Sequence, residues 1–155
     1  VPEAEIVLYN IPGRCGIKIN PTTMAKLHES CPNIIGVKQS VADMDEASEI
    51  AALLPSDQWL IWSGDDSLTL PMMAASRAHG VVSVQAHLNG RQIRRMIQAF
   101  KQNRVSEAQA LHLKLHHLAR ELFFLPNPTV VKTCLAEWGI VGPTFRLPMV
   151  PPDSS

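Results

Sequence analysis

Short apolar runs alternate with amphipathic stretches along the first half of the chain. Four of these runs are rich in β-branched or aromatic side chains and have the length of buried strands. They are residues 6–9, 33–38, 59–62 and 80–84. The segments between them have the spacing and end signals of helices, which we predict over residues 21–30, 44–54 and 68–77. The pattern predicts a strand–helix unit that is repeated four times.

Polar side chains gather where each predicted strand ends. They are Tyr9, Asn10 and Arg14, then Lys38, then Ser63, Asp65 and Asp66, and finally Ser83. Strands that alternate with helices form parallel sheets, whose carboxyl ends meet at one edge. That edge binds ligands both in a TIM barrel and in a doubly wound sheet, so polarity alone does not separate these folds. Because a barrel needs eight units, we predict an α/β fold that is half a TIM (β/α)8 barrel.

The second part of the chain has a helical pattern. We predict helices over residues 91–102, 106–124 and 128–138. A buried helix face is indicated by leucines at helical spacing, namely Leu111, Leu115, Leu118 and Leu122. The proline-rich tail over residues 146–152 is expected to lie extended. We divide the chain into residues 1–88, the half-barrel, and residues 89–155, the final barrel helix with a helical extension and the tail.

Several local signals predict where helices begin or are interrupted. Asn20 is expected to be an N-cap, and Asp43 is expected to open the following helix. Asp65 and Asp66 are expected to cap the next helix rather than to bind a metal ion. One proline and two glycines in residues 10–16 predict a loop that is incompatible with a helix.

The composition is that of a folded chain with a sizeable core, because 46% of the 155 residues are hydrophobic and 18% are charged. The formal net charge is zero and basic residues are scattered, so nothing favours nucleic acid or a membrane as a partner. No apolar run approaches the roughly 18 residues of a membrane span. Three cysteines fit neither a zinc site nor a disulfide framework, and we expect a cytoplasmic protein. No signal-like segment opens the chain, and its start at Val1 suggests a beginning in mid-fold.

Lys38 ends the apolar strand predicted over residues 33–38. A lysine at the mouth of a buried strand is costly unless it is paired or performs chemistry. Burial favours the neutral amine, which is the species that attacks a carbonyl group to form a Schiff base. The alternative is a strand that has simply reached solvent, with Lys38 as its first exposed residue. This segment alone leaves both interpretations open.

Residues 9–16 have the sequence Tyr-Asn-Ile-Pro-Gly-Arg-Cys-Gly, and residues 35–38 have the sequence Ile-Gly-Val-Lys. The first resembles the YNxPxRTG motif of the dihydrodipicolinate synthase (4-hydroxy-tetrahydrodipicolinate synthase) family, and the second resembles the strand that bears its Schiff-base lysine. Further segments match the family in the right order at residues 63–66, 80–84, 127–132 and 146–148. The resemblance covers essentially the whole chain and corresponds to the C-terminal half of the family's barrel with its helical extension.

This resemblance implies condensation of pyruvate with aspartate semialdehyde in lysine biosynthesis, without a cofactor or a metal. It makes Lys38 the nucleophile that forms a Schiff base with pyruvate, and Tyr9 the general acid and base that carries protons. Arg14 would hold the carboxylate of the second substrate through its planar fork of donors. Gly64 and Val82 would line the pyruvate pocket. The alternatives are an ordinary strand-end aromatic for Tyr9 and a solvated loop residue for Arg14.

The chain departs from the family pattern at three positions. Cys15 stands where threonine is usual, Gln39 replaces a common glutamate, and His87 stands where asparagine is frequent. These departures bear on substrate preference. His112 and His116 have the spacing of metal ligands on a helix, but without a third ligand we predict no metal site.

The resemblance also implies what this half lacks. In the family, the first half supplies a threonine pair that holds pyruvate and a second tyrosine that joins the proton relay. We therefore expect a chain that is inactive without an N-terminal half-barrel, in a homo-oligomer that is a tetramer in the family. One alternative is a catalytically silent unit in which two copies pair their exposed edges. Another is a different pyruvate aldolase, such as an N-acetylneuraminate or keto-deoxy-sugar-acid lyase, against which Arg14 argues.

Overall fold

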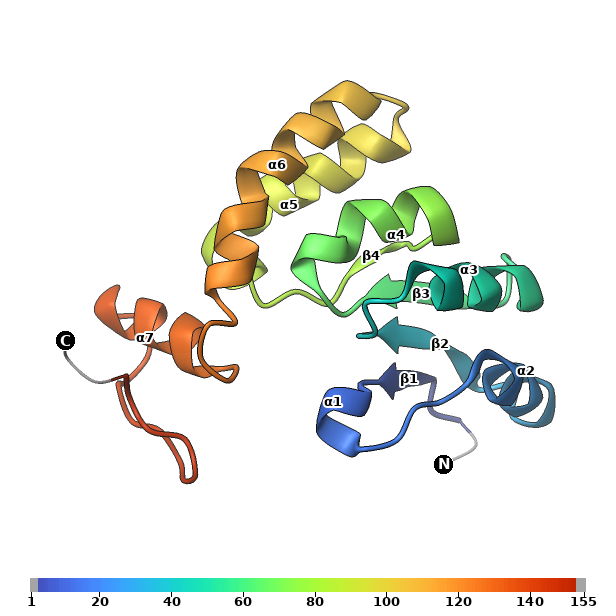
Figure 1. The fold of residues 1–155 in the computed structure, drawn as a ribbon, viewed down its shortest axis with the longest axis horizontal. Helices are drawn as coiled ribbons and strands as arrows, with labels where there is room; N and C mark the ends of the chain where they lie inside the picture. The colour runs from blue at the N-terminus through green and yellow to red at the C-terminus, as the bar shows by residue number, and fades with distance from the viewer. Residues whose placement is uncertain (1–2, 153–155) are drawn as a thin grey trace. The chain divides into compact units, whose positions relative to one another are not determined.

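The structure is a computed structural model that describes residues 3–152 (Figure 1). The chain forms two compact units, of which the first ends at Ser83 and the second begins at Val84, and each is described by itself. The predicted boundary after residue 88, between half-barrel and extension, stays a prediction. Among residues 3–152, no helix is both long enough and apolar enough to cross a membrane.

The first unit is built on a parallel sheet of four strands. They are β1 (Ile6–Asn10), β2 (Ile34–Gln39), β3 (Leu60–Ser63) and β4 (Gly80–Val81). The strands lie in the order β1-β2-β3-β4, so each pairs with the strand that follows it in the chain (Figure 1). A doubly wound sheet would reverse its direction at a switch point. The uninterrupted order therefore favours part of a barrel over a doubly wound sheet.

Helices bury one face of this sheet. They are α2 (Pro21–Ser30), α3 (Met44–Leu53) and α4 (Thr69–Ser76), and a 3₁₀ turn, η1 (Asp66–Leu68), precedes α4. α2 packs against β2, and α4 packs against β3 and β4. The core between the two layers contains side chains that are almost wholly buried, among them Met24, Val37, Ile50, Ile61 and Met72. Burying such side chains is the main force that holds the helices on the sheet.

The opposite face of the sheet is far more accessible. In β1, Val7 and Tyr9 are 40% and 46% exposed, whereas Asn10, which points the other way, is 1% exposed. Successive residues of a strand alternate between the faces, so this contrast follows from the pleat. In a closed barrel, this second face lines the interior.

The segment after β1 contains one turn of helix that the sequence analysis excluded. α1 covers Pro12–Cys15, so the prediction that proline and glycine prevent a helix here was wrong. Pro12 occupies the first helical turn, where its missing N–H has no helical partner to lose. Gly16 ends the turn with a φ of 72°, a left-handed conformation that glycine adopts without strain. The same residues that break a long helix therefore begin and end this short one.

β4 is shorter than the strand predicted over residues 80–84. Its ladder joins Trp62 to Gly80 and Ser63 to Val81, and it stops there because β3 ends at Ser63. One more bond follows, in which the Val82 N–H donates to the Ser63 carbonyl at 2.9 Å. Beyond this point the described residues provide no neighbouring strand with which β4 could pair.

The predicted helix starts differ in their side-chain bonds. The Asp43 carboxylate accepts hydrogen bonds from the N–H groups of Asp45 and Glu46, so it caps α3 as predicted. Asn20 holds the N-cap position of α2 but makes no side-chain cap bond. Asp65 likewise precedes η1 without such a bond, so that part of the capping prediction was wrong.

The second unit is helical, with α5 (Ala86–Lys101), α6 (Val105–Glu121) and α7 (Thr129–Glu137). α5 begins before the predicted residue 91 because one irregular turn precedes the regular helix, with Asn89 at φ −141° and ψ 42°. α5 and α6 pack side by side (Figure 1). The predicted leucine face of α6 is confirmed by Leu115 and Leu122, which are buried. Residues 138–152 contain no helix or strand, as predicted for the tail.

Candidate active site

Lys38 and Tyr9 lie side by side on the accessible face of the sheet. Their Cα atoms are partners in the β1–β2 ladder, so both side chains leave the sheet on the same face. The Lys38 Nζ lies 3.8 Å from the centroid of the Tyr9 ring. Lys38 is half-buried and Tyr9 is exposed, so a small molecule can reach both groups. The arrangement brings a primary amine next to a phenol, a pair that can combine nucleophilic attack with proton transfer.

Trp62 continues this row across the sheet. It is the partner of Lys38 in the β2–β3 ladder and is half-buried. Trp62 therefore continues the row on the side of Lys38 away from Tyr9, and its ring lies 6.4 Å from the ring of His79. The sequence analysis did not single out this residue. The signal was present, since Trp62 ends its apolar run as Lys38 ends the preceding one.

Gly36 allows β2 and β3 to approach closely beneath the lysine. A Cβ atom at this position would lie 2.2 Å from the backbone oxygen of Leu60, far inside contact distance. Gly36 stands two residues before Lys38 and pairs with Leu60 in the ladder. Any larger residue would push the strands apart and shift the row that contains the lysine.

The other predicted site residues also follow the carboxyl ends of the strands. Arg14 lies on α1 with its side chain exposed. Gly64 follows β3, and its N–H donates to the carbonyl of Gln39 at 2.8 Å, while a Cβ there would meet the Ser40 hydroxyl. Val82 follows β4 and is 48% exposed. Each of the predicted residues therefore lies at one edge of the sheet or just beyond it.

Asp65 is an acidic group close to the lysine. Burial raises the pKa of the Asp65 carboxyl above its usual range, and the neighbouring Asp66 raises it further. The charge of Lys38 acts in the opposite direction on the same pKa. The Asp66 carboxylate accepts a hydrogen bond from the Ser83 hydroxyl. The sequence analysis assigned both residues to helix capping and missed the link between Asp65 and Lys38.

His112 and His116 lie close together on α6. His112 and His116 lie with their ring centroids 5.8 Å apart, and burial, followed by the charge of His116, lowers the pKa of His112. Among residues 3–152, no three His, Cys, Asp or Glu side chains are grouped as ligands for a metal ion. Of the departures from the family pattern, Cys15 is exposed at the end of α1, and His87 lies in the irregular first turn of α5.

Comparison with known proteins identifies the family. The sequence model of the Dihydrodipicolinate synthetase family matches residues 1–155. The chain belongs to this family. It is 44% identical over 155 residues to the 4-hydroxy-tetrahydrodipicolinate synthase of Cyanothece sp., a match that covers 100% of this chain and 52% of the relative.

Solved structures of the family show the same fold. The dihydrodipicolinate synthase of Aquifex aeolicus superposes with a TM-score of 0.93 at 39% identity, covering 97% of this chain and 51% of that one. The enzyme of Acinetobacter baumannii, solved as a complex with pyruvate, superposes with a TM-score of 0.89 at 31% identity, covering 98% and 51% of the two chains. The chain thus spans about half the length of the relatives that it matches. Its fold is the C-terminal half of a TIM barrel followed by a helical extension, as predicted.

Proposed function

We propose that this chain is the C-terminal half of a 4-hydroxy-tetrahydrodipicolinate synthase, a lyase that condenses pyruvate with L-aspartate 4-semialdehyde in lysine biosynthesis. The observation that carries the proposal is the Lys38 amine, 3.8 Å from the centre of the Tyr9 ring at the carboxyl edge of a parallel sheet. Two comparisons support the proposal. The Cyanothece relative is named 4-hydroxy-tetrahydrodipicolinate synthase, and the Acinetobacter baumannii enzyme was solved as a complex with pyruvate.

In this proposal, Lys38 is the nucleophile. Its neutral Nζ attacks the ketone carbon of pyruvate, and the resulting carbinolamine loses water to form an imine. The methyl group of the bound pyruvate then loses a proton and gives an enamine, whose terminal carbon attacks the aldehyde carbon of the second substrate. Hydrolysis of the product imine releases the product and restores the free amine. The lysine supplies the electron sink, so the reaction needs no cofactor.

Tyr9 carries the protons in this scheme, because a phenol both donates and accepts. It stands beside the amine on which the carbinolamine and the imine form. Arg14 binds the carboxylate of the second substrate, a role suited to its planar fork of donors and to its exposed position. Gly64 and Val82 line the pyruvate pocket.

We further propose that this activity requires an N-terminal half-barrel. β1 and β4 stand at the two ends of the strand order, so each pairs with a strand on one side only. Such edges form further strand pairs readily. The relatives contain about as much chain again, which is the length that four more strand–helix units require. The complete enzyme is then expected to be a homo-oligomer, as in the family.

Borohydride trapping tests the assignment of Lys38. The chain is incubated with pyruvate and sodium borohydride, which reduces an imine to a stable amine, and the adduct is located by peptide mass spectrometry. We expect one adduct per chain, on Lys38, and none in Lys38→Arg. Lys26→Arg, on an exposed position of α2, is the matched control and should be trapped like the parent chain.

The trapping experiment is repeated with the N-terminal half of the Cyanothece relative added, and this second measurement decides whether Lys38 is the nucleophile. An adduct on another lysine, or none in folded protein, would overturn the assignment and favour a catalytically silent unit. Turnover with a sugar-derived aldehyde in place of aspartate semialdehyde would favour a different pyruvate aldolase of the same superfamily.

A further inference from the structure

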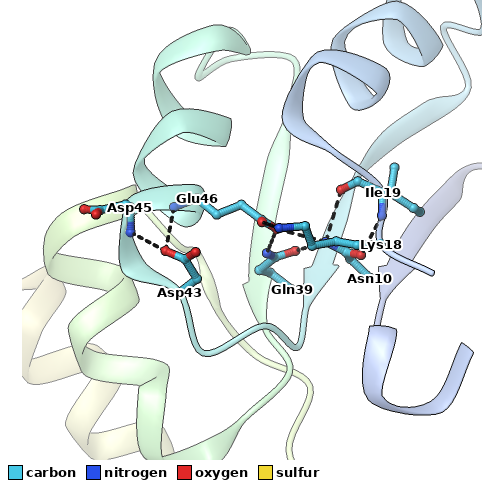
Figure 2. A network of polar contacts seen from close by, with 7 residues as sticks. All are labelled: Asn10, Lys18, Ile19, Gln39, Asp43, Asp45 and Glu46. Atoms are coloured by element: carbon cyan, nitrogen blue, oxygen red, sulfur yellow. Dashed lines mark hydrogen bonds and ion pairs between the residues drawn. The ribbon is translucent and has the colours of Figure 1, made fainter. Parts of the chain in front are cut away.

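A buried polar network lies on the face of the sheet opposite Lys38. Asn10 and Gln39 directly follow Tyr9 and Lys38 in the chain, so their side chains point to the helix-covered face. Both are almost fully buried, as is Glu46 of α3, which is 6% exposed. Figure 2 shows these three side chains converging between β1, β2 and α3. Buried polar groups of this kind persist only when they are hydrogen-bonded to one another.

The three side chains are joined pairwise. The Asn10 Nδ2 donates to the Gln39 Oε1 at 2.9 Å and lies 3.2 Å from the Glu46 Oε1 (Figure 2). The Gln39 Nε2 donates to the same Glu46 oxygen at 2.8 Å. The amide of Gln39 therefore lies between two partners. It accepts a hydrogen bond from the amide of Asn10 and donates one to the carboxylate of Glu46. This order of donors and acceptors fixes the orientation of all three groups.

The network also closes the loop that carries Arg14. The Asn10 Oδ1 accepts a hydrogen bond from the Ile19 N–H at 3.0 Å, and the Asn10 Nδ2 lies 3.2 Å from the Ile19 carbonyl. This two-way contact joins the end of β1 to the chain beyond α1 (Figure 2). Lys18 pairs with the outer Glu46 oxygen at 2.5 Å, and this carboxylate raises the pKa of Lys18 through the hydrogen bond and the charge.

The position of the network gives it a direct effect on the reactive pair. Asn10 and Gln39 are Cα partners in the ladder, one step beyond the partners Tyr9 and Lys38. The side-chain bond between Asn10 and Gln39 fixes the spacing of β1 and β2 next to the point where Tyr9 and Lys38 leave the sheet. The strands end at these residues, where the Ser40 N–H still donates to the Asn10 carbonyl at 2.9 Å and the Gly64 N–H to the Gln39 carbonyl at 2.8 Å. The side-chain network adds to these last backbone bonds.

The network also accounts for the glutamine in place of the glutamate that is common in the family. A glutamate at position 39 would place a second carboxylate oxygen against Glu46 at about the 2.8 Å now spanned by a hydrogen bond. Two buried carboxylates at this distance repel unless they share a proton. The other charged residues that line the same surface pocket as Glu46 are Lys18, Asp43, Asp45 and Glu49. They include one cation, which the Glu46 charge already engages.

We propose that Asn10, Gln39 and Glu46 are positioning residues, whose charge-matched network sets the separation of Lys38 and Tyr9 for imine formation. The inference rests on the proposed function of Lys38 where it is tested by pyruvate trapping. It does not rest on that function where it is tested by the position of the Lys38 side chain. The network requires one amide and one carboxylate at positions 39 and 46, and in this chain Gln39 supplies the amide and Glu46 the carboxylate.

The test uses three variants of the full chain, paired with the N-terminal half. In Gln39→Glu, we expect pyruvate trapping at Lys38 to fall at least tenfold at pH 8. Relative to the parent chain at the same pH, trapping should recover as the pH falls, because a proton shared by the two carboxylates restores a hydrogen bond between them. Gln39→Glu combined with Glu46→Gln reverses donor and acceptor, and its rate should return to within about threefold of the parent chain. Glu49→Gln removes a charge from the exposed side of α3 and is the matched control.

A second readout does not depend on pyruvate. Lysines are reductively methylated with ¹³C-formaldehyde, and the NMR signal of dimethylated Lys38 reports its position beside the Tyr9 ring, whose ring current shifts it. We expect this signal to move in Gln39→Glu and to return in the double variant. If Gln39→Glu does not fold, Gln39→Met, which is uncharged and of similar size, takes its place.

The two readouts separate the possible failures. Absence of a pyruvate adduct in the parent chain would contradict the proposed function, while a shifted signal in Gln39→Glu would still support the positioning role. A folded Gln39→Glu with the parent's trapping rate at every pH and an unmoved Lys38 signal would overturn this inference. So would a double variant that recovers stability but neither readout, since that result is expected of a network that only holds the fold.

Discussion

Alternation along two strands assigns opposite tasks to adjacent residues. Tyr9 and Lys38 leave the sheet on its accessible face, whereas Asn10 and Gln39, one step later, are buried beneath it. The amine and the phenol are therefore exposed to small molecules while their backbone stays tied to the core. At this scale, Tyr9 has two separable parts, a ring whose π face contacts Lys38 and a hydroxyl to which we assign the proton transfer.

Two substitutions of Tyr9 separate these parts. Tyr9→Phe keeps the ring beside Lys38 and removes the hydroxyl, so we expect the rate of pyruvate trapping to fall about 10²-fold or more, as when a general acid–base group is lost. Tyr9→Leu also removes the ring and should in addition displace the NMR signal of dimethylated Lys38. Stopped-flow or quenched borohydride trapping measures the rate. A Tyr9→Phe variant with the parent's trapping rate would show that the phenol carries no proton in imine formation.

At the scale of elements, the sequence pattern predicted each strand and the longer helices because apolar periodicity survives in the folded chain. It failed where two signals compete. In α1, proline and glycine break helices in general but also begin and end them, and a single turn contains both positions. β4 is short because its partner β3 ends at Ser63, a limit that no residue of β4 itself encodes.

The candidate site divides in the same way. Lys38 drew attention because its apolar run ends in lysine, but its own strand left an ordinary exposed lysine open, and its role as nucleophile came from the family resemblance. Tyr9 and Arg14 depended on a motif shared with a known family. The Asn10–Gln39–Glu46 network was missed because its members lie far apart in the sequence and share no spacing. Only the register of the sheet and the placement of α3 bring them together.

Helix capping at the starts of α2 and α3 offers a matched comparison. Asp43 accepts two backbone hydrogen bonds, whereas Asn20 holds the same position in α2 without a side-chain bond. Asp43→Ala should lower the free energy of unfolding by about 1 kcal/mol, the usual cost of a lost cap. Asn20→Ala should change it by no more than a few tenths of a kcal/mol. Urea unfolding followed by tryptophan fluorescence, to which the buried Trp59 contributes, measures both, and equal effects would contradict the assignment of the cap.

At the scale of the whole molecule, the first unit has two sheet edges, β1 and β4, that would pair with further strands in a closed barrel. The sheet ends at β1 and at β4, and apolar side chains that a barrel encloses are exposed, Val7 and Val82 among them. Exposed edges and apolar surface of this kind are filled by strand pairing and burial. The relatives are about twice as long as this chain, and their N-terminal halves are the segments that we expect to cover these edges.

Mixing the two halves tests this completion. The N-terminal half of the Cyanothece relative is the natural partner, since that protein is 44% identical to this chain over the half they share. Light scattering should give assemblies that contain both halves in equal number. Synthase turnover should appear in the mixture and be absent from either half alone, because we propose that the added half supplies groups that hold pyruvate and complete the proton relay. Lys38→Arg should assemble normally and remain inactive, which separates assembly from chemistry.

Two outcomes would contradict this completion. A chain that folds cooperatively and turns over alone would show that the half-barrel needs no partner. A stable pair of identical chains that excludes the added half would identify a second copy as the partner that covers the open edges.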